Sequence, residues 1–274
     1  MRTLVVGAGG MLGQDVVRVT GAEGLTRAEL DVTDRRAVRE AIGPDHLVIN
    51  CAAWTDVDGA EEHPAEALRV NRDGARNVAE AAGAVAYLST DYVFDGRGRI
   101  PYLESDPTGP LSSYGRSKLE GERATAAASE RHFIVRSSWL FGAGGKNFVE
   151  TMLRSGTASG RRPRALDLSP EVRVVDDQVG CPTFTGHLAE ALAAIVEGED
   201  FGMHHMAASG SCSWFEFAQE IFARAGKDVE VAPCTSAEFP RPAERPAWSV
   251  LGSERGHSLP HWRDGLQAYL GVRV

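Results

Sequence analysis

The fold is decided by the stretch Arg2-Thr3-Leu4-Val5-Val6-Gly7-Ala8-Gly9-Gly10-Met11-Leu12-Gly13. Its first five residues form a short run that is largely apolar and β-branched, which is typical of a buried strand. Gly7, Gly10 and Gly13 follow at intervals of three, and residues 14–19 then read as a helix. This is the setting of a dinucleotide-binding fingerprint, because glycines let the backbone approach a pyrophosphate that the helix N-terminus attracts. The stretch therefore predicts a cofactor site in the first βα turn.

The sequence continues with alternating strand-like and helix-like segments. We expect strands at 2–6, about 24–26, 46–51, 84–89 and 132–136, and helices at 11–20, 34–42, 61–82 and 112–128. This alternation predicts an α/β fold of the Rossmann type, with a doubly wound parallel sheet. Beyond Gly142 the pattern is less regular, with a strand expected at 172–175 and helices at 187–197 and 214–225, the last capped by Ser213.

A tyrosine and a lysine lie four residues apart in the expected helix 112–128. On a helix, Tyr114 and Lys118 share one face and are a single turn apart. The Lys118 ammonium would then favour the tyrosinate and lower the pKa of Tyr114 from about 10 toward neutrality. A phenol tuned in this way can exchange a proton with a carbonyl or an alcohol. Taken alone, the same spacing also fits a solvated helix face.

The strand expected at 84–89 ends in hydroxyl residues, Ser89 and Thr90, which Asp91 follows. Ligands of an open α/β sheet bind outside the carboxyl ends of its strands, so these side chains are candidates for a site. A hydroxyl group there can hydrogen-bond a substrate carbonyl and stabilise the charge that develops on its oxygen. Side chains alternate between the faces of a strand, and the sequence alone leaves open whether Ser89 or Thr90 faces the site.

The composition argues against several classes of protein. A chain of 274 residues with a formal net charge of −9 can form one or two domains and is not expected to bind nucleic acid in general. No apolar run approaches the roughly 20 residues of a membrane span. The first strand begins at once, so we expect no signal peptide and a cytoplasmic location. The four cysteines are far apart and indicate neither a zinc site nor a disulfide framework: Cys51, Cys181, Cys212 and Cys234.

Together these motifs resemble those of the extended short-chain dehydrogenases/reductases, and more narrowly those of the dTDP-4-dehydrorhamnose reductase family. The resemblance covers nearly the whole chain. Besides the glycine fingerprint, it is carried by Asn50-Cys51-Ala52-Ala53-Trp54-Thr55, Ser89-Thr90-Asp91-Tyr92-Val93-Phe94-Asp95-Gly96, Tyr114-Gly115-Arg116-Ser117-Lys118, Arg136-Ser137-Ser138-Trp139-Leu140-Phe141-Gly142, Lys146-Asn147-Phe148-Val149, Asp177-Gln178-Val179-Gly180-Cys181-Pro182-Thr183 and Arg245-Pro246-Ala247-Trp248-Ser249-Val250-Leu251.

The resemblance implies a Rossmann domain over 1–142, to which about 172–199 return, and a smaller sugar-nucleotide lobe from 143–171 and 200–274. It implies an oxidoreductase that uses NAD(P)H to reduce the 4-keto group of a dTDP-4-keto-6-deoxyhexose, for dTDP-rhamnose or a specialised deoxysugar. Tyr114 is then the proton donor, Lys118 its partner and a ligand of the nicotinamide ribose, and Thr90 the favoured ligand of the carbonyl. Two alternatives stay open: a non-catalytic NADP-binding regulatory subunit of the methionine adenosyltransferase type, and a sugar-nucleotide epimerase.

The cofactor contacts that the resemblance implies gather around the fingerprint, the next two strand ends and the catalytic helix: Gly7, Gly10, Met11, Leu12, Gly13, Arg27, Asp31, Val32, Cys51, Ala52, Ala53, Tyr114 and Lys118. Asp31 lies about 20 residues past the fingerprint, where NAD-binding proteins carry an acid. The second strand is expected to end near Thr26-Arg27, however, and an arginine there can meet the 2′-phosphate of NADP. We therefore expect NADPH, with NADH as the alternative.

The sugar-nucleotide contacts that the resemblance implies are Ser89, Thr90, Asp91, Trp139, Asn147 and Arg245. Arg245 is expected to pair with the diphosphate. Trp139 fits core packing equally well.

Other segments have expected structural roles. We expect Asp177 and Gln178 to hold loops together. His204 and His205 should point to opposite faces of a strand. The segment 261–266 lacks a glutamate, so we expect no bridging metal, and a homodimer is compatible with the family. The connection between Ser155 and Glu171 is longer than usual for the family.

Overall fold

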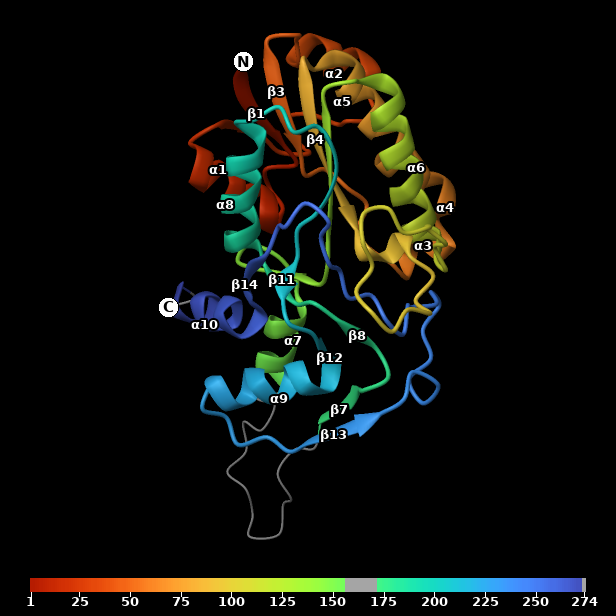
Figure 1. The fold of residues 1–274 in the computed structure, drawn as a ribbon, viewed down its shortest axis with the longest axis vertical. Coiled ribbons are helices and arrows are strands. Elements are labelled where there is room, and N and C mark those ends of the chain that lie inside the picture. Colours follow the sequence, from red (N-terminus) through yellow and green to blue (C-terminus); the bar gives the residue numbers. More distant parts are fainter. Residues whose placement is uncertain (156–171, 273–274) are drawn as a thin grey trace.

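The computed structural model describes residues 1–155 and 172–272. Its centre is a six-stranded sheet with the strand order β10-β5-β4-β3-β1-β2 (Figure 1), and every neighbouring pair is parallel. The strands are β1 (Arg2–Val6), β2 (Glu23–Leu25), β3 (His46–Asn50), β4 (Ala84–Thr90), β5 (His132–Ser137) and β10 (Gly202–His205). The predicted α/β fold is confirmed. The long connection predicted between Ser155 and Glu171 lies outside the described residues.

Helices cover both faces of this sheet because its strands are apolar on both sides. On one face, α1 (Met11–Thr20) packs against α8 (Thr185–Val196), and on the other α2 (Arg35–Ala41), α5 (Ala75–Ala81) and α6 (Ser113–Ala128) lie side by side. The alternation of β1 follows this division. Val5 belongs to the core beneath α1 and α8, whereas Leu4 and Val6 belong to the core beneath α2 and α5.

The single helix predicted at 61–82 is divided into four pieces, so that prediction was wrong in detail. The chain forms α3 (Gly59–Glu62), α4 (Pro64–Leu68), a π-helical turn (Arg69–Gly74) and then α5. Pro64 has no N–H group and is favoured at the start of a helix, so it begins α4 rather than continuing α3. The π-turn holds the Asn71 side chain against Ser117 Oγ of α6, at 2.8 Å.

A smaller lobe lies beyond the carboxyl ends of the strands (Figure 1). Its apolar core is built from α7 (Phe148–Ser155), α9 (Trp214–Arg224) and α10 (Trp262–Val272), with β7 (Val172–Val175) and β13 (Val231–Cys234) paired beside α9. The predicted cap of α9 is confirmed, because Ser213 and Glu216 form a reciprocal capping box. Short strand pairs connect the lobe to the sheet: β6 (Leu140–Phe141) with β9 (Thr183–Phe184), β8 (Val179–Gly180) with β12 (Cys212–Ser213), and β11 (Ala208–Ser209) with β14 (Leu259–His261).

Two segments belong to a different part of the molecule from the one predicted for them. β10 falls in the range 200–274 predicted for the smaller lobe, yet it is the edge strand of the main sheet. Val174 of β7 falls in the range predicted to return to the Rossmann domain, yet it is buried in the core of the smaller lobe. Both segments are short, and their partners are far away in the sequence, so local patterning did not predict them. The remainder of the division stays a prediction.

The two histidines of β10 have different partners, as their alternation predicted. His204 contacts His257 and the Asp200 carbonyl, whereas His205 contacts the carbonyl oxygens of Tyr102 and Gly252.

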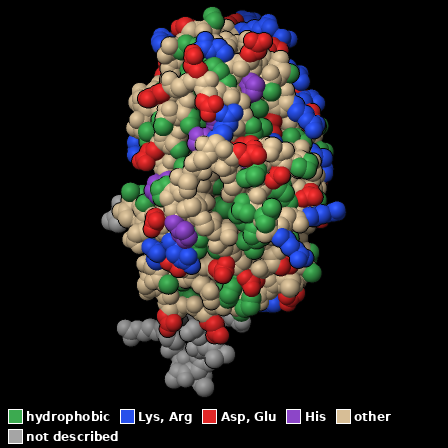
Figure 2. Space-filling view, in the orientation of Figure 1, with side chains coloured by type: hydrophobic (Ala, Val, Ile, Leu, Met, Phe, Trp, Pro, Cys, Tyr) green, Lys and Arg blue, Asp and Glu red, His purple; other side chains and the backbone are tan. Residues whose placement is uncertain are grey.

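The described residues include no helix long and apolar enough to cross a membrane. Figure 2 shows acidic and basic side chains interspersed over the face that it presents, so this face carries no extended basic surface.

Candidate active site

A cavity of about 320 Å³ lies at the carboxyl ends of the strands. Its walls come from three predicted regions: residues 10–13 of the fingerprint, Cys51 and Ala53 after β3, and Ser89, Tyr114 and Lys118. Thr55, Leu88, Leu140, Thr185 and the 144–146 loop also line it, and the two threonines were not among the predicted site residues. The fold thus brings together residues that are more than 100 positions apart.

The glycine turn can pack closely against the neighbouring backbone only because it lacks side chains. Gly7 has a φ of +79°, and a Cβ atom there would lie 2.5 Å from the Ala52 nitrogen. A Cβ atom on Gly13 would collide with the Gly7 carbonyl. Gly10 is the N-cap of α1 and provides no side-chain cap, and the first turn of this helix lines the cavity with residues 10–13. This cradle fits the pyrophosphate of a dinucleotide.

The two residues predicted to contact the adenosine ribose, Arg27 and Asp31, both follow β2 and have different surroundings. Arg27 follows the strand by two residues, is exposed, and makes no ion pair with any described residue. The Asp31 carboxylate instead accepts hydrogen bonds from Thr33 N (2.9 Å) and Thr33 Oγ1 (2.8 Å), which lower the pKa of Asp31. Val32 is buried in the core.

Helix α6 places Tyr114 and Lys118 one turn apart, as the spacing predicted. The helix begins at a cap in which Ser112 Oγ accepts a hydrogen bond from Gly115 N. Lys118 is buried; its Nζ atom donates to the Leu88 carbonyl at 2.5 Å and lies 4.2 Å from the centre of the Tyr87 ring. Burial lowers the pKa of Lys118 to about 7.

The expected lowering of the Tyr114 pKa toward neutrality is not observed. Burial raises the pKa of Tyr114 to about 12, while the Thr90 hydroxyl lowers it by a smaller amount. Burial removes water from the phenolate form of Tyr114, and this desolvation is the largest effect on its pKa. The spacing of Tyr114 and Lys118 gives no information on burial. Tyr114 therefore carries its proton at neutral pH.

The two hydroxyl groups at the end of β4 point to different partners. Thr90 lies beside Tyr114 and donates to Asp91 Oδ1 at 3.0 Å. Ser89 Oγ donates to Glu122 of α6 at 2.5 Å. The alternation of the strand therefore sets Thr90 against the phenol, which agrees with the preference for Thr90.

Asp91 is buried directly beside these groups. Burial raises the pKa of Asp91 to about 6, although hydroxyl donors oppose this shift. Two of them are Thr90 Oγ1 and Ser138 Oγ, each 3.0 Å from a carboxylate oxygen. Asp91 thus orients the Thr90 hydroxyl next to Tyr114.

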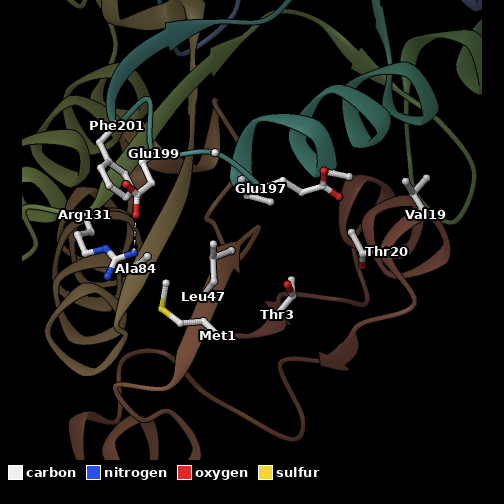
Figure 3. A pocket seen from close by; sticks show the side chains of 13 residues that line it. Met1, Thr3, Val19, Thr20, Leu47, Ala84, Arg131, Glu197, Glu199 and Phe201 are labelled. Carbon is white, nitrogen blue, oxygen red and sulfur yellow. Dashed lines mark ion pairs between the residues drawn. The ribbon is translucent and has the colours of Figure 1, made fainter.

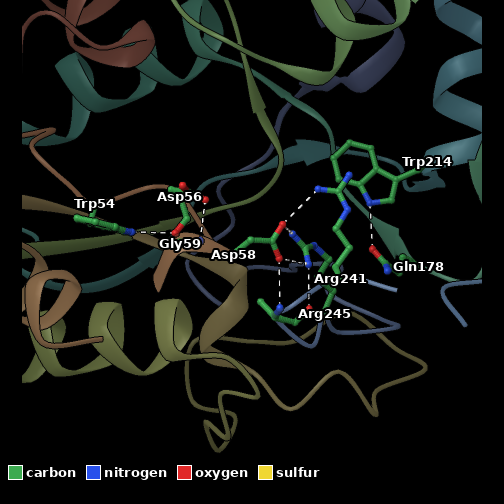
Figure 4. Close-up of polar contacts among 9 residues, drawn as sticks. Trp54, Asp56, Asp58, Gly59, Gln178, Trp214, Arg241 and Arg245 are labelled. Atoms are coloured by element: carbon green, nitrogen blue, oxygen red, sulfur yellow. Dashed lines mark hydrogen bonds and ion pairs between the residues drawn. The ribbon is translucent and has the colours of Figure 1, made fainter. Parts of the chain in front are cut away.

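A cluster of charges connects the loop after β3 to the proline-rich loop 239–246 (Figure 4). Arg245 makes a two-pronged ion pair with Asp58, with Nη1–Oδ1 at 3.0 Å and Nη2–Oδ2 at 2.9 Å. Arg241 reaches the same carboxylate at 3.2 Å. The bond from Arg245 is the largest cause that lowers the pKa of Asp58 to about 2. Neither Asp58 nor Arg241 was predicted, because their pairing joins positions 183 or more residues apart.

Trp139 lies in an aromatic stack between the lobes. Its ring is parallel to that of Trp214 at 3.5 Å, and Phe148 lies 4.6 Å from Trp214. Trp139 is also the one non-glycine residue of the described chain with a positive φ, +46°. This left-handed backbone is uncommon for a bulky residue and shows that packing holds the ring in place. The Trp214 Nε1 atom is fixed by Gln178 at 3.2 Å (Figure 4).

Asn147 mainly organises its own loop. Its amide donates to the Gly142 carbonyl at 2.8 Å, and its oxygen accepts from Glu150 N at the start of α7. The expectation that Asp177 and Gln178 hold loops together is confirmed, because both bond Ser236. In the described residues no group of three or more histidine, cysteine, aspartate or glutamate side chains could hold a metal ion.

A separate hollow of about 450 Å³ lies at the opposite, amino-terminal edge of the sheet (Figure 3). Arg131 and Glu199 form an ion pair there at 3.7 Å, and Phe201 and Leu47 also line the hollow. It contains none of the predicted site residues. The candidate active site is therefore the cavity at the carboxyl edge.

The geometry of this cavity agrees with comparisons to known proteins. Residues 1–273 match the family model described as the RmlD substrate binding domain. A dTDP-4-dehydrorhamnose reductase of Mycolicibacterium smegmatis is 42% identical, over 97% of this chain and 84% of that protein. The chain belongs to the dTDP-4-dehydrorhamnose reductase family.

Other members of this family agree in sequence and in fold. A probable dTDP-4,6-dihydroxy-2-methyloxan-3-one 4-ketoreductase of Streptomyces antibioticus is 40% identical, over 97% of this chain and 94% of that protein. The crystal structure of the Bacillus anthracis dTDP-4-dehydrorhamnose reductase in complex with NADP is similar with a TM-score of 0.91 and 34% identity, and covers 99% of both chains. The predicted family is thus confirmed, and with it the class of NAD(P)H-dependent sugar-nucleotide oxidoreductases.

Proposed function

We propose that this chain reduces the 4-keto group of a dTDP-4-keto-6-deoxyhexose, with Tyr114, Lys118 and Thr90 as its catalytic residues. The observation that carries the proposal is that a protonated Tyr114 and a buried Lys118 line one cavity with the glycine turn, while the Thr90 hydroxyl lies beside Tyr114.

The bound reduced cofactor would supply a hydride to the carbonyl carbon. Tyr114 donates its phenol proton to the carbonyl oxygen, so one hydride and one proton convert the ketone into the alcohol. The pKa of Tyr114, about 12, keeps this proton in place until charge develops on the substrate. The Lys118 ammonium, one turn along α6, then stabilises the phenolate that is left.

Thr90 serves as the second hydrogen-bond donor at the carbonyl oxygen. In the protein alone its hydroxyl donates to Asp91 Oδ1. It can turn to a substrate oxygen because Asp91 keeps the hydrogen bond from Ser138. A fixed donor at the oxygen where charge develops lowers the barrier of the reaction.

We propose NADPH as the preferred cofactor. The exposed Arg27 at the end of β2 supports this preference, because its guanidinium can pair with a 2′-phosphate. One oxygen of the Asp31 carboxylate, Oδ1, already accepts hydrogen bonds from Thr33 N and Thr33 Oγ1, which leaves Asp31 less acceptor capacity for the ribose of NAD. The Bacillus anthracis relative binds NADP.

For the substrate, we propose that Arg245 and its neighbour Arg241 border the diphosphate, and that Trp139 borders the sugar. Asp91 and Asn147 act through the loops and hydroxyl groups that they hold. We keep a cytoplasmic location and a homodimer as predictions.

The test is NADPH oxidation by dTDP-4-keto-6-deoxyglucose, prepared with and without a 3,5-epimerase. We expect stoichiometric oxidation, and Tyr114→Phe should lower kcat by about 10²- to 10⁴-fold because the proton donor is lost. The matched control is Tyr269→Phe, which removes a hydroxyl that bonds Glu150 in the smaller lobe. Epimerase dependence would assign the sugar series.

Two outcomes would contradict the proposal. Cofactor binding without oxidation, with any of these sugars, would support the regulatory-subunit alternative. Interconversion of sugar isomers without net oxidation would support the epimerase.

A further inference from the structure

A third residue continues the stripe that Tyr114 and Lys118 form on α6. Glu122 follows Lys118 by four residues, so the three side chains succeed one another on one face of the helix, a turn apart. This face packs on β4. Glu122 is buried, 3% exposed, and no step of the reduction described above uses it.

The Glu122 carboxylate is held by two other elements of the sheet. Ser89 Oγ of β4 donates to Oε1 at 2.5 Å, and Arg136 of β5 donates from Nε to Oε1 at 2.9 Å and from Nη2 to Oε2 at 2.8 Å. The side chains of Glu122 and Arg136 are each 4% exposed. The guanidinium lies over the Phe94 ring, 5.1 Å from its centre. Neither the position nor the partners of this carboxylate can vary easily.

The groups that face Lys118 include few other charges. Cys51 lies at the end of β3, and burial raises the pKa of its thiol to about 12. Burial also raises the pKa of the Tyr87 phenol on β4 well above its ordinary value. Tyr114 on α6 is protonated as described, and the Leu88 carbonyl is neutral. Of the groups named here, Glu122, which is ion-paired with Arg136, therefore supplies the negative charge that acts on Lys118.

We propose that Glu122 is a positioning residue of the reduction, whose fixed carboxylate favours the ammonium form of the buried Lys118 behind Tyr114. The proposal rests on the role given to Lys118 in the proposed function. A buried lysine favours its neutral form, which could neither stabilise a phenolate nor attract the ribose oxygens as strongly. Burial lowers the pKa of Lys118, and the Glu122 charge is the larger of the effects that raise it again.

The test uses the small number of lysines. The sequence contains three, Lys118, Lys146 and Lys227, so ¹³Cε-lysine labelling gives three signals. We expect the Lys118 signal of the wild type to titrate near 7, and the Glu122→Gln variant to titrate about one pH unit lower. The Lys146 and Lys227 signals should not move. An unchanged Lys118 midpoint would overturn the proposal.

The matched control is Glu120→Gln, the same substitution two residues away. Glu120 pairs with Arg123 at 2.6 Å on the exposed side of α6, so its loss should leave the Lys118 midpoint unchanged. An equal shift in both variants would mean that any lost charge on the helix acts on Lys118, and would contradict a specific role of Glu122.

A variant that is expected to shift the Lys118 midpoint in the opposite direction distinguishes an electrostatic effect from a loss of structure. Arg136→Gln leaves the Glu122 charge less neutralised, so the Lys118 midpoint should rise. If a single variant does not fold, the double variant Glu122→Gln/Arg136→Gln leaves no buried charge unpaired, and its midpoint should again lie below that of the wild type. Shifts of the same direction in the two single variants would overturn the proposal.

Activity gives the second readout. With NADPH and the keto sugar, the alkaline limb of kcat/KM should move to lower pH in Glu122→Gln and to higher pH in Arg136→Gln. The lysine titration needs no turnover. If it shifts as expected but the wild type oxidises no NADPH with these sugars, the proposed function fails while the coupling of Glu122 to Lys118 stands.

Discussion

Two carboxylate–arginine pairs connect distant parts of this chain, and they lie in opposite surroundings. Glu122 and Arg136 join α6 to β5 with 4% of each side chain exposed. Asp58 joins the loop after β3 to Arg241 and Arg245, and the side chains of these three residues are 25%, 51% and 16% exposed. The first pair lies between α6 and the sheet, and the second joins two loops (Figure 4).

The difference in exposure indicates which role each ion pair can have. A buried pair on regular elements cannot change partners, so it acts through its field on neighbours such as Lys118. A pair on loops can exchange a carboxylate for a ligand phosphate at small cost, because water solvates the released group. We therefore associate the first pair with proton transfer and the second with substrate binding.

The largest expected effect is on the free energy of unfolding, which compares how much each ion pair stabilises the fold. Glu122→Gln should lower the free energy of unfolding by about 3–5 kcal/mol, because it leaves the Arg136 charge buried without its partner. Asp58→Asn should lower it by only about 1 kcal/mol, because the Arg241 side chain is 51% exposed and Arg245 keeps its hydrogen bond to the Ala243 carbonyl. Urea unfolding monitored by far-UV circular dichroism measures both. Equal losses would remove the distinction between the two pairs.

A smaller effect concerns the buried lysine. Because the pKa of Lys118 is about 7 in the folded protein and about 10.4 when unfolded, the unfolded state binds more protons between these values. Stability should therefore rise with pH in this window, by about 2 kcal/mol from pH 7 to pH 9. Lys118→Met should be more stable than the wild type at pH 7 and lose this part of the slope. Unfolding at both pH values gives the answer; a slope that persists in the variant would contradict the buried charge.

The smallest effect tests the exchangeable pair. Arg245→Lys removes the two-pronged geometry toward Asp58 and toward a diphosphate, so KM for the sugar nucleotide should rise about tenfold while kcat changes little. Steady-state kinetics measures both constants. Arg123→Lys, on the exposed side of α6, is the control and should leave both unchanged. A fall in kcat at constant KM would place Arg245 with the proton-transfer groups instead.

Much of the fold was predictable because its signals are local. The fingerprint, the strands that precede each helix and the spacing of Tyr114 and Lys118 are patterns within a few residues, and the structure has them at or close to the predicted positions. β10, α7 and α10 were not predicted as elements. β10 is a short edge strand recognised only by its pairing with β5, and α7 and α10 complete the core of the smaller lobe.

The candidate site was predictable in part for the same reason. Residues named from motifs gather at one sheet edge, but Asp58, Arg241, Trp214 and Glu122 carry no motif of their own. Each was recognised only through a partner from another segment: Asp58 and Arg241 through their pairing with each other, Trp214 through Gln178, and Glu122 through Arg136.

The sequence by itself determined the parallel α/β fold, the cofactor turn and the family, because strand and helix periods and glycine spacing act over short distances. Only the tertiary structure decided that Thr90 and not Ser89 lies beside Tyr114, that burial raises the pKa of Tyr114 and lowers that of Lys118, and which carboxylate meets which arginine. The physical reason is that desolvation and ion pairing depend on the packing of distant segments, which no local pattern encodes.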